Sequence, residues 1–459
     1  MSRLLTAICI FVNLGILQAQ PPAAPSQPAP LAAQPSQSPD PALKFTKVDD
    51  ALRSEADALD EQFEKRGLVL HDPSLQAYVD SIGHRVLGDR PVPEKVTWRF
   101  LVVSDPAANA FALPNGSVYL TTGLLALLEN EAQLAGVIGH ETAHIFERHP
   151  YLENRDIRKK TVISEIIATA AAFAPGGFAA RLATAAGANV STLLLVESVY
   201  GYSRAMESQA DQEGLVSMSA AGYDPHAMAV AFELLDEESS FEFQPRSTFF
   251  HDHPDPKKRR EDAMTFAGAH TPPNPRTGSK LDYITAIAPA IVFNINADLE
   301  SRRPRSAVAR ASRLVEVFPT DPQYQVLLGE SYRTLGAKST VPTLDELTSD
   351  GQSRERKQVL SMSAEEEQRD LLKNPANLAT LKENQTNAEK AFLAAIARNP
   401  DYALAYRELG FLYQDEGRYA DAATNYRHYL QLVADTSLDR LRIRRRLAEV
   451  EKLQAPPPH

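Results

Sequence analysis

The sequence has one cysteine among 459 residues, Cys9, and it lies in an apolar run near the N-terminus. We expect residues 1–19 to be a cleaved signal peptide, because Arg3 precedes the run and the small residue Ala19 follows it. An uncleaved membrane anchor is the alternative. Without Cys9, the mature chain has no disulfides and no thiolate ligands, so any metal site must use nitrogen and oxygen atoms.

The sequence also lacks long apolar runs and positive net charge. Region 161–197 is largely apolar, but Pro175-Gly176-Gly177 and Arg181 interrupt it before it reaches the roughly 20 residues that span a bilayer. It is either a buried helical hairpin or a lid with peripheral membrane contact. The formal net charge is −11, and we expect the basic run Lys257–Arg260 to cap a solvated helix. We therefore expect no nucleic-acid partner.

Composition and periodicity divide the remaining chain. Residues 20–43, rich in Pro, Ala and Gln, are expected to be a disordered linker. A mostly α-helical domain with a small β-sheet is expected over residues 44–272, and a second helical domain over 281–454. The first domain should begin with helices between Lys44 and Leu87, followed by a strand over Val96–Val103.

A hairpin is predicted where Asn115-Gly116 separates two strand-like runs. Pro114 beside it suggests an edge strand, because proline cannot donate a ladder hydrogen bond. Such an edge could hold an extended peptide, or the hairpin could be purely structural. Thr121 to Leu128 should form a helix that leads into the next motif.

The pattern His-Glu-x-x-His occupies residues 140–144 within an apolar, helix-periodic stretch that Asn130 could cap. On a helix, His140 and His144 lie one turn apart on the same face and can bind one metal ion. Glu141 could act as general base on a water molecule at that metal. A buried helix carries two histidines and a glutamate in one turn only if something compensates them, and a metal ion does so.

A third ligand is expected from the helix predicted over Ser203–Ala220. Glu207 and Asp211 lie one turn apart on it. Glu207 could bind the metal while Asp211 accepts a hydrogen bond from a ligand histidine. Pairs of acidic residues at this spacing are otherwise common on solvated helix faces, so the assignment depends on the preceding motif.

Several motifs in order resemble the HtpX/BepA-like zinc metallopeptidases, gluzincins related to the CAAX prenyl endopeptidases. They are Asn109–Pro114, Gly123–Leu125, Asn130–His144, and Ser203-Arg204 through Glu207 and Asp211. The resemblance covers about residues 45–270. It implies one zinc ion per chain held by His140, His144 and Glu207, with Glu141 as catalytic base.

The resemblance also assigns a position to a histidine outside these motifs. His253, before Pro254, matches the family's His-Pro position. There the histidine can occupy the open zinc position in a latent state, or steady the oxyanion in an active one. His251 lies two residues away and competes for the assignment.

The C-terminal part shows a tetratricopeptide pattern, which predicts an α-solenoid. Each repeat of this kind consists of two helices. Residues typical of the second helix recur 34 residues apart, with residues typical of a first helix between them. A weaker unit lies earlier in the sequence, before a polar insertion near 339–369. The second-helix positions are Ala388, Phe392, Ala395 and Pro400, then Ala422 and Tyr426; the first-helix positions are Tyr406, Leu409, Gly410 and Tyr413; the earlier unit has Ala307, Pro319, Leu328, Gly329 and Tyr332.

A peptidase domain joined to such repeats behind a signal peptide resembles the periplasmic members of the family. This implies cleavage of unfolded or stalled envelope proteins, with the repeats recruiting substrate or the outer-membrane assembly machinery. The alternative is a latent peptidase that acts mainly as a periplasmic chaperone or a repeat-based binding scaffold.

Overall fold

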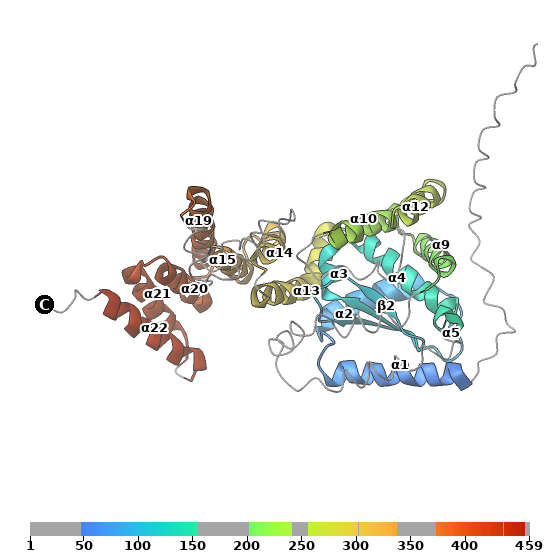
Figure 1. The fold of residues 1–459 in the computed structure, drawn as a ribbon, viewed down its shortest axis with the longest axis horizontal. Coiled ribbons are helices and arrows are strands. Elements are labelled where there is room, and N and C mark those ends of the chain that lie inside the picture. The colour runs from blue at the N-terminus through green and yellow to red at the C-terminus, as the bar shows by residue number, and fades with distance from the viewer. Residues whose placement is uncertain are drawn as a thin grey trace, which may run out of the picture. The chain divides into compact units, whose positions relative to one another are not determined.

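The computed structural model describes residues 47–153, 202–240, 256–301, 303–336, 373–434 and 436–454 (Figure 1). The predicted signal peptide and linker, region 161–197, His251, His253 and the polar insertion lie outside these residues and stay predictions. Among the helices of the described ranges, none is both long enough and apolar enough to cross a bilayer.

A three-stranded sheet has β3 at its centre, with β1 parallel on one side and β2 antiparallel on the other. The predicted hairpin joins β2 to β3, and Gly116 in its turn has a φ of 98°, which favours glycine. The predicted first strand is confirmed but begins at Arg99, and Thr97 before it donates its N–H to the carbonyl of the turn residue Asn115. The strands are β1 (Arg99–Val103), β2 (Ala110–Ala112) and β3 (Ser117–Thr121).

Alternating side chains of the strands enter two separate cores, as the period of two in a strand requires. Leu101, Phe111 and Tyr119 face α1 (Lys47–Lys65). Phe100 and Val118 face the larger core, which contains α2 (Pro73–Leu87) and the motif helix α4 (Glu131–Phe146). The predicted helices between Lys44 and Leu87 are thus confirmed as α1 and α2, one on each face of the sheet (Figure 1).

The motif helix is α4 (Glu131–Phe146), and the Asn130 side chain accepts a hydrogen bond from the Gln133 N–H as the predicted N-cap. The helix predicted from Ser203 is α9 (Arg204–Ala220), capped by the Ser203 hydroxyl. The other helices of this region are α3 (Thr122–Leu127), α5 (His149–Glu153), α10 (His226–Ser240) and α12 (Pro256–His270).

Helices α4 and α9 approach each other closely at two glycines. A Cβ atom on Gly139 would lie 2.9 Å from the Gly214 carbonyl oxygen, and one on Gly214 would lie 2.8 Å from the His140 nitrogen. No larger residue fits at either position without moving a helix backbone. Since Glu207, Asp211 and Gly214 follow helical spacing, the same crossing brings both carboxylates towards the α4 histidines.

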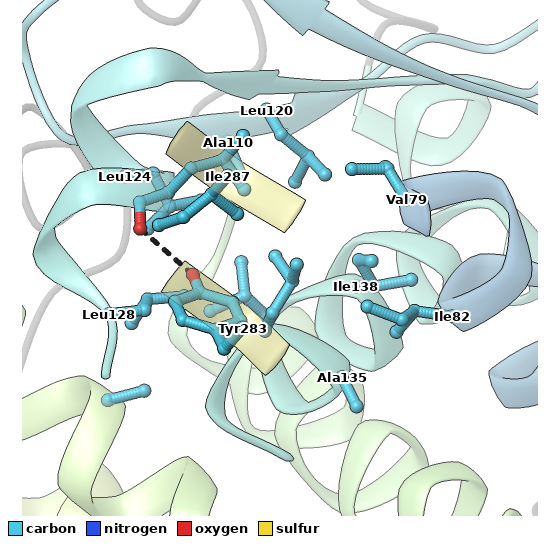
Figure 2. Close-up of a cluster of buried hydrophobic side chains, with 14 of the residues drawn as sticks. Val79, Ile82, Ala110, Leu120, Leu124, Leu128, Ala135, Ile138, Tyr283 and Ile287 are labelled. Atoms are coloured by element: carbon cyan, nitrogen blue, oxygen red, sulfur yellow. Dashed lines mark hydrogen bonds between the residues drawn. The ribbon is translucent and has the colours of Figure 1, made fainter. Parts of the chain in front are cut away.

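Helix α13 (Lys280–Glu300) completes the larger core (Figure 2). Its Tyr283 hydroxyl donates a hydrogen bond to the Leu125 carbonyl at 2.9 Å, the dashed line in Figure 2, and Ile287 packs beside it. The Asn294 amide donates to the Thr122 carbonyl at 2.7 Å. This helix shares its core with α2, α3 and α4, although the predicted boundary at 272–281 assigns it to the repeat domain.

The repeat pattern corresponds to helix pairs with a core of their own, which includes Phe392, Leu409 and Tyr426. A Cβ on Gly329 would lie 2.4 Å from the Phe392 ring, and one on Gly410 would lie 2.5 Å from the Tyr426 ring, so each predicted glycine admits an aromatic side chain of another helix. The helices are α14 (Pro304–Val317), α15 (Pro322–Leu335), α19 (Pro375–Arg398), α20 (Ala403–Asp415), α21 (Tyr419–Leu432) and α22 (Leu438–Gln454).

Candidate metal centre

The side chains of His140, His144 and Glu207 meet where α4 crosses α9. The two histidine Nε2 atoms are 3.1 Å apart. Each is 3.6 Å from a different oxygen of the Glu207 carboxylate. One ligand atom from each residue lies within 4.8 Å of the others, and all three residues are buried.

This donor set fits one zinc ion. Ligand atoms bound tetrahedrally to zinc at about 2.0–2.1 Å lie roughly 3.3–3.4 Å from one another. The observed separations of 3.1 and 3.6 Å fall on either side of that value. Two imidazoles and one carboxylate leave a fourth coordination position, as catalytic rather than structural zinc sites do.

Asp211 contacts the far side of the first histidine. Its Oδ1 lies 2.9 Å from His140 Nδ1, so the carboxylate can accept the imidazole N–H while Nε2 points at the metal position. Arg259 of α12 donates two hydrogen bonds to the same carboxylate, from Nε at 2.7 Å and from Nη2 at 2.6 Å. Both residues are buried, with Asp211 6% and Arg259 5% exposed. The second carboxylate of the predicted pair therefore anchors a ligand rather than facing solvent.

Burial and neighbouring charges have opposing effects on the pKa values of Asp211 and Arg259. Burial by itself raises the pKa of Asp211, but the Arg259 charge and hydrogen bonds from His140 and Arg259 together bring the pKa well below its ordinary value. Burial lowers the pKa of Arg259, but Asp211, Glu207 and Glu141 outweigh it and raise that pKa. The carboxylate and the guanidinium thus stay charged inside the protein, each because of the other.

Glu141 is buried at 2% exposed, directly after His140 on α4. It is close enough to Arg259 for the two charges to interact. The structure therefore places the predicted base within the charged cluster formed by His140, Glu207 and Asp211.

A second group of polar side chains surrounds His144. The Nδ1 atoms of His149 and His144 are 3.0 Å apart, and the Tyr202 ring stacks on the His144 ring at 4.0 Å between centroids. His149 Nε2 lies 3.3 Å from the Gln209 side-chain oxygen, and the Gln209 amide donates to Glu147 at 2.5 Å. Burial lowers the pKa of His149. None of these four side chains was predicted to belong to the site.

The structure brings together five of the six predicted site residues, and His253 lies outside the described ranges. The prediction for the basic run at 257–260 is wrong in one residue. Lys257, Lys258 and Arg260 are exposed, but Arg259 is buried because its partner Asp211 lies on α9. Its spacing from the buried residues Ala263 and Phe266 was the available signal, since four and seven residues later is the same helix face.

Residues 73–266 match the family model of peptidase family M48, and residues 384–436 match a tetratricopeptide repeat model. Residues 73–266 are a peptidase M48 domain. This M48 domain contains the whole donor cluster, so the chain carries a zinc metallopeptidase domain with a donor set for one zinc ion. The predicted fold class, an M48-type domain followed by tetratricopeptide repeats, is confirmed.

Several curated proteins are similar to part of this chain. The putative beta-barrel assembly-enhancing protease of Vibrio cholerae is 30% identical over 238 residues, which are 51% of this chain and 47% of that protein. The beta-barrel assembly-enhancing protease of Escherichia coli K12 is 28% identical over 209 residues, 44% of this chain and 41% of that protein. The mitochondrial metalloendopeptidase OMA1 of Schizosaccharomyces pombe is 32% identical over 183 residues, 40% and 50% of the two chains. The chain thus spans about half the length of these relatives.

Proposed function

We propose that this protein is a zinc-dependent endopeptidase that cleaves misfolded or stalled proteins of a bacterial envelope. The observation that supports it best is the convergence of His140, His144 and Glu207 beside the buried Glu141, inside an M48 domain. The histidines would bind the metal through Nε2 and the glutamate through its carboxylate. Asp211 would hold the His140 ring in the tautomer that leaves Nε2 unprotonated.

In this proposal the chain's own groups move the protons. A zinc ion at the site supplies Lewis-acid activation of a water molecule and of the scissile carbonyl. The Glu141 carboxylate accepts a proton from the attacking water and passes it to the leaving amine, which prevents expulsion of a charged amide. Strand β2 lies at an edge of the three-stranded sheet, and in this proposal that edge could hold an extended peptide beside the site.

The envelope role is supported by the relatives and by the sequence. Beta-barrel assembly-enhancing proteases are among the similar proteins, and the predicted signal peptide would deliver this chain to a periplasm. The repeats supply helix pairs of the kind that bind segments of other proteins. We propose that they recruit substrate or the outer-membrane assembly machinery.

The test compares wild type with Glu141→Gln for bound zinc and for cleavage of casein as an unfolded substrate. We expect about one zinc per chain in both proteins, because the substitution spares the three donors. Cleavage should fall by about 10²–10⁴-fold, the usual cost of losing a general base. Equal cleavage by the two proteins would refute the role of Glu141. A zinc-loaded wild type without proteolysis would favour the chaperone or scaffold alternative.

A further inference from the structure

The two candidate ligand histidines use their second ring nitrogens differently. His140 Nδ1 faces the carboxylate of Asp211 at 2.9 Å. His144 Nδ1 faces another imidazole, that of His149, at 3.0 Å between Nδ1 atoms. Two facing ring nitrogens can share only one hydrogen, so one of these rings must donate and the other must accept.

The metal position decides which ring donates. A neutral histidine that presents its Nε2 lone pair to a metal carries its hydrogen on Nδ1. His144 is therefore the donor, and His149 must present an unprotonated Nδ1. The hydrogen of His149 is then on Nε2, which lies 3.3 Å from the side-chain oxygen of Gln209, an acceptor.

The next contact agrees with this direction. The Gln209 oxygen accepts, so its amide nitrogen is free to donate, and it lies 2.5 Å from the Glu147 carboxylate. Every hydrogen bond thus runs one way, from His144 through His149 and Gln209 to a carboxylate that can only accept. The opposite tautomer of His149 would place two donors against each other at His144 and leave Gln209 facing a bare nitrogen.

The backbone conformation between His144 and His149 allows their rings to meet. Helix α4 ends at Phe146, and Arg148 has a φ of 58°, in the left-handed region that non-glycine residues rarely adopt. This residue separates α4 from α5, whose first residue is His149. The Tyr202 ring stacks on the His144 ring with 19° between the planes, and its centroid lies 5.8 Å from that of the His149 ring.

We propose that His149 is a positioning residue of the zinc site: as a neutral hydrogen-bond acceptor, held in its Nε2–H tautomer by Gln209, it orients the His144 imidazole towards the metal. This inference rests on the proposed zinc site. It gives the two ligand histidines different supports, a charged carboxylate for His140 and a neutral imidazole for His144.

The test uses the full chain, with Zn²⁺ alone as the probe. His149→Phe keeps a ring but removes the acceptor, whereas His149→Asn keeps an oxygen near the place of Nδ1. We expect the phenylalanine variant to bind zinc about 10–100-fold more weakly in competition with a chromogenic chelator. The asparagine variant should stay close to wild type. His71→Phe serves as the control, because His71 is exposed and pairs only with Glu64 in the described structure.

A second measurement determines the tautomer directly in the wild-type protein, so it does not depend on whether a variant folds. Long-range ¹H–¹⁵N spectra of histidine-labelled, zinc-loaded wild type should show His149 protonated at Nε2 and bare at Nδ1. A proton on His149 Nδ1, or equal zinc affinities of the phenylalanine and asparagine variants, would overturn the proposal while leaving the zinc site intact. A wild type that binds no zinc would instead refute the proposed function, and this inference with it.

Discussion

The buried pair of Arg259 and Asp211 should be a large contributor to the stability of the M48 domain. The guanidinium donates two hydrogen bonds to one carboxylate, at 2.7 and 2.6 Å, and neither residue is more than 6% exposed. It also lies 4.3 Å from the centroid of the Phe232 ring. Replacement of Arg259 by methionine keeps much of the aliphatic volume but leaves Asp211 in contact with His140 without the guanidinium.

Removing one member of a buried ion pair costs about 3–5 kcal/mol, mostly because the other charge stays buried without compensation. We therefore expect Arg259→Met to lower the free energy of unfolding by about that amount, and Asp211→Asn to lower it similarly. The double variant should lose clearly less than the sum of the two single variants, because neither member of this pair is then buried without the other. The neighbouring Lys258→Met is the control. Lys258 forms an exposed i,i+4 pair with Asp262, so its loss should cost no more than about 0.5 kcal/mol.

The chain contains one tryptophan, which makes the measurement specific for the M48 domain. Trp98 packs against Phe146 at the end of α4, with 5.2 Å between ring centroids. Its fluorescence during urea unfolding therefore reports on the domain that holds the site, separately from the repeats. A chelator should be present, because bound metal would stabilise the folded state by mass action. Equal losses in Arg259→Met and Lys258→Met, or additive losses in the double variant, would refute the reasoning.

Three further outcomes are expected. Glu207→Ala should strip zinc from the purified protein, whereas Asp211→Ala should reduce zinc affinity by only about 10–100-fold. A lower zinc content in Asp211→Ala than in Glu207→Ala would mean that Asp211 is the ligand and Glu207 is not. His253→Ala should raise casein cleavage if this histidine occupies the open metal position, and His251→Ala should not; lower cleavage by the first variant would exclude a latch. The stability advantage of wild type over Asp211→Asn should persist above about pH 4 and shrink progressively at lower pH, since a carboxyl group with a depressed folded pKa contributes stability that is lost as the pH falls through that pKa. Urea unfolding at pH 7 and pH 3 should show a smaller difference at pH 3.

The sequence was informative where the decisive contacts are local. His140, Glu141 and His144 lie within one helical turn, and the Asn130 and Ser203 caps lie within three residues of the N–H groups that they accept. The repeat pattern was equally readable where Gly410 meets Tyr426, because these two residues lie 16 positions apart in consecutive helices. In each case, one short segment contains both the signal and most of the structure it specifies.

The residues that sequence reasoning missed depend on contacts between segments. Arg259 lies among three exposed basic residues, and its burial is set by Asp211, which is 48 residues earlier on another helix. His149 reaches His144 only because the chain turns through a left-handed residue at Arg148, and arginine gives no sign of that conformation as glycine would. A pattern of residue types cannot predict such a turn, so the second group of side chains was not detectable.

The close crossing of α4 and α9 explains why both groups can serve one site. With no side chain at Gly139 or Gly214, the helix backbones come near enough for the Glu207 carboxylate to reach both histidines. Each histidine then presents Nε2 to the shared metal position. The Nδ1 atom of His140 faces the carboxylate of Asp211, and the Nδ1 atom of His144 faces the imidazole of His149. Asp211 and Arg259 come from α9 and α12, whereas His149 and Gln209 come from α5 and α9. Because α9 supplies a ligand and a member of each support, a displacement of this one helix would disturb the donor and both histidine orientations together.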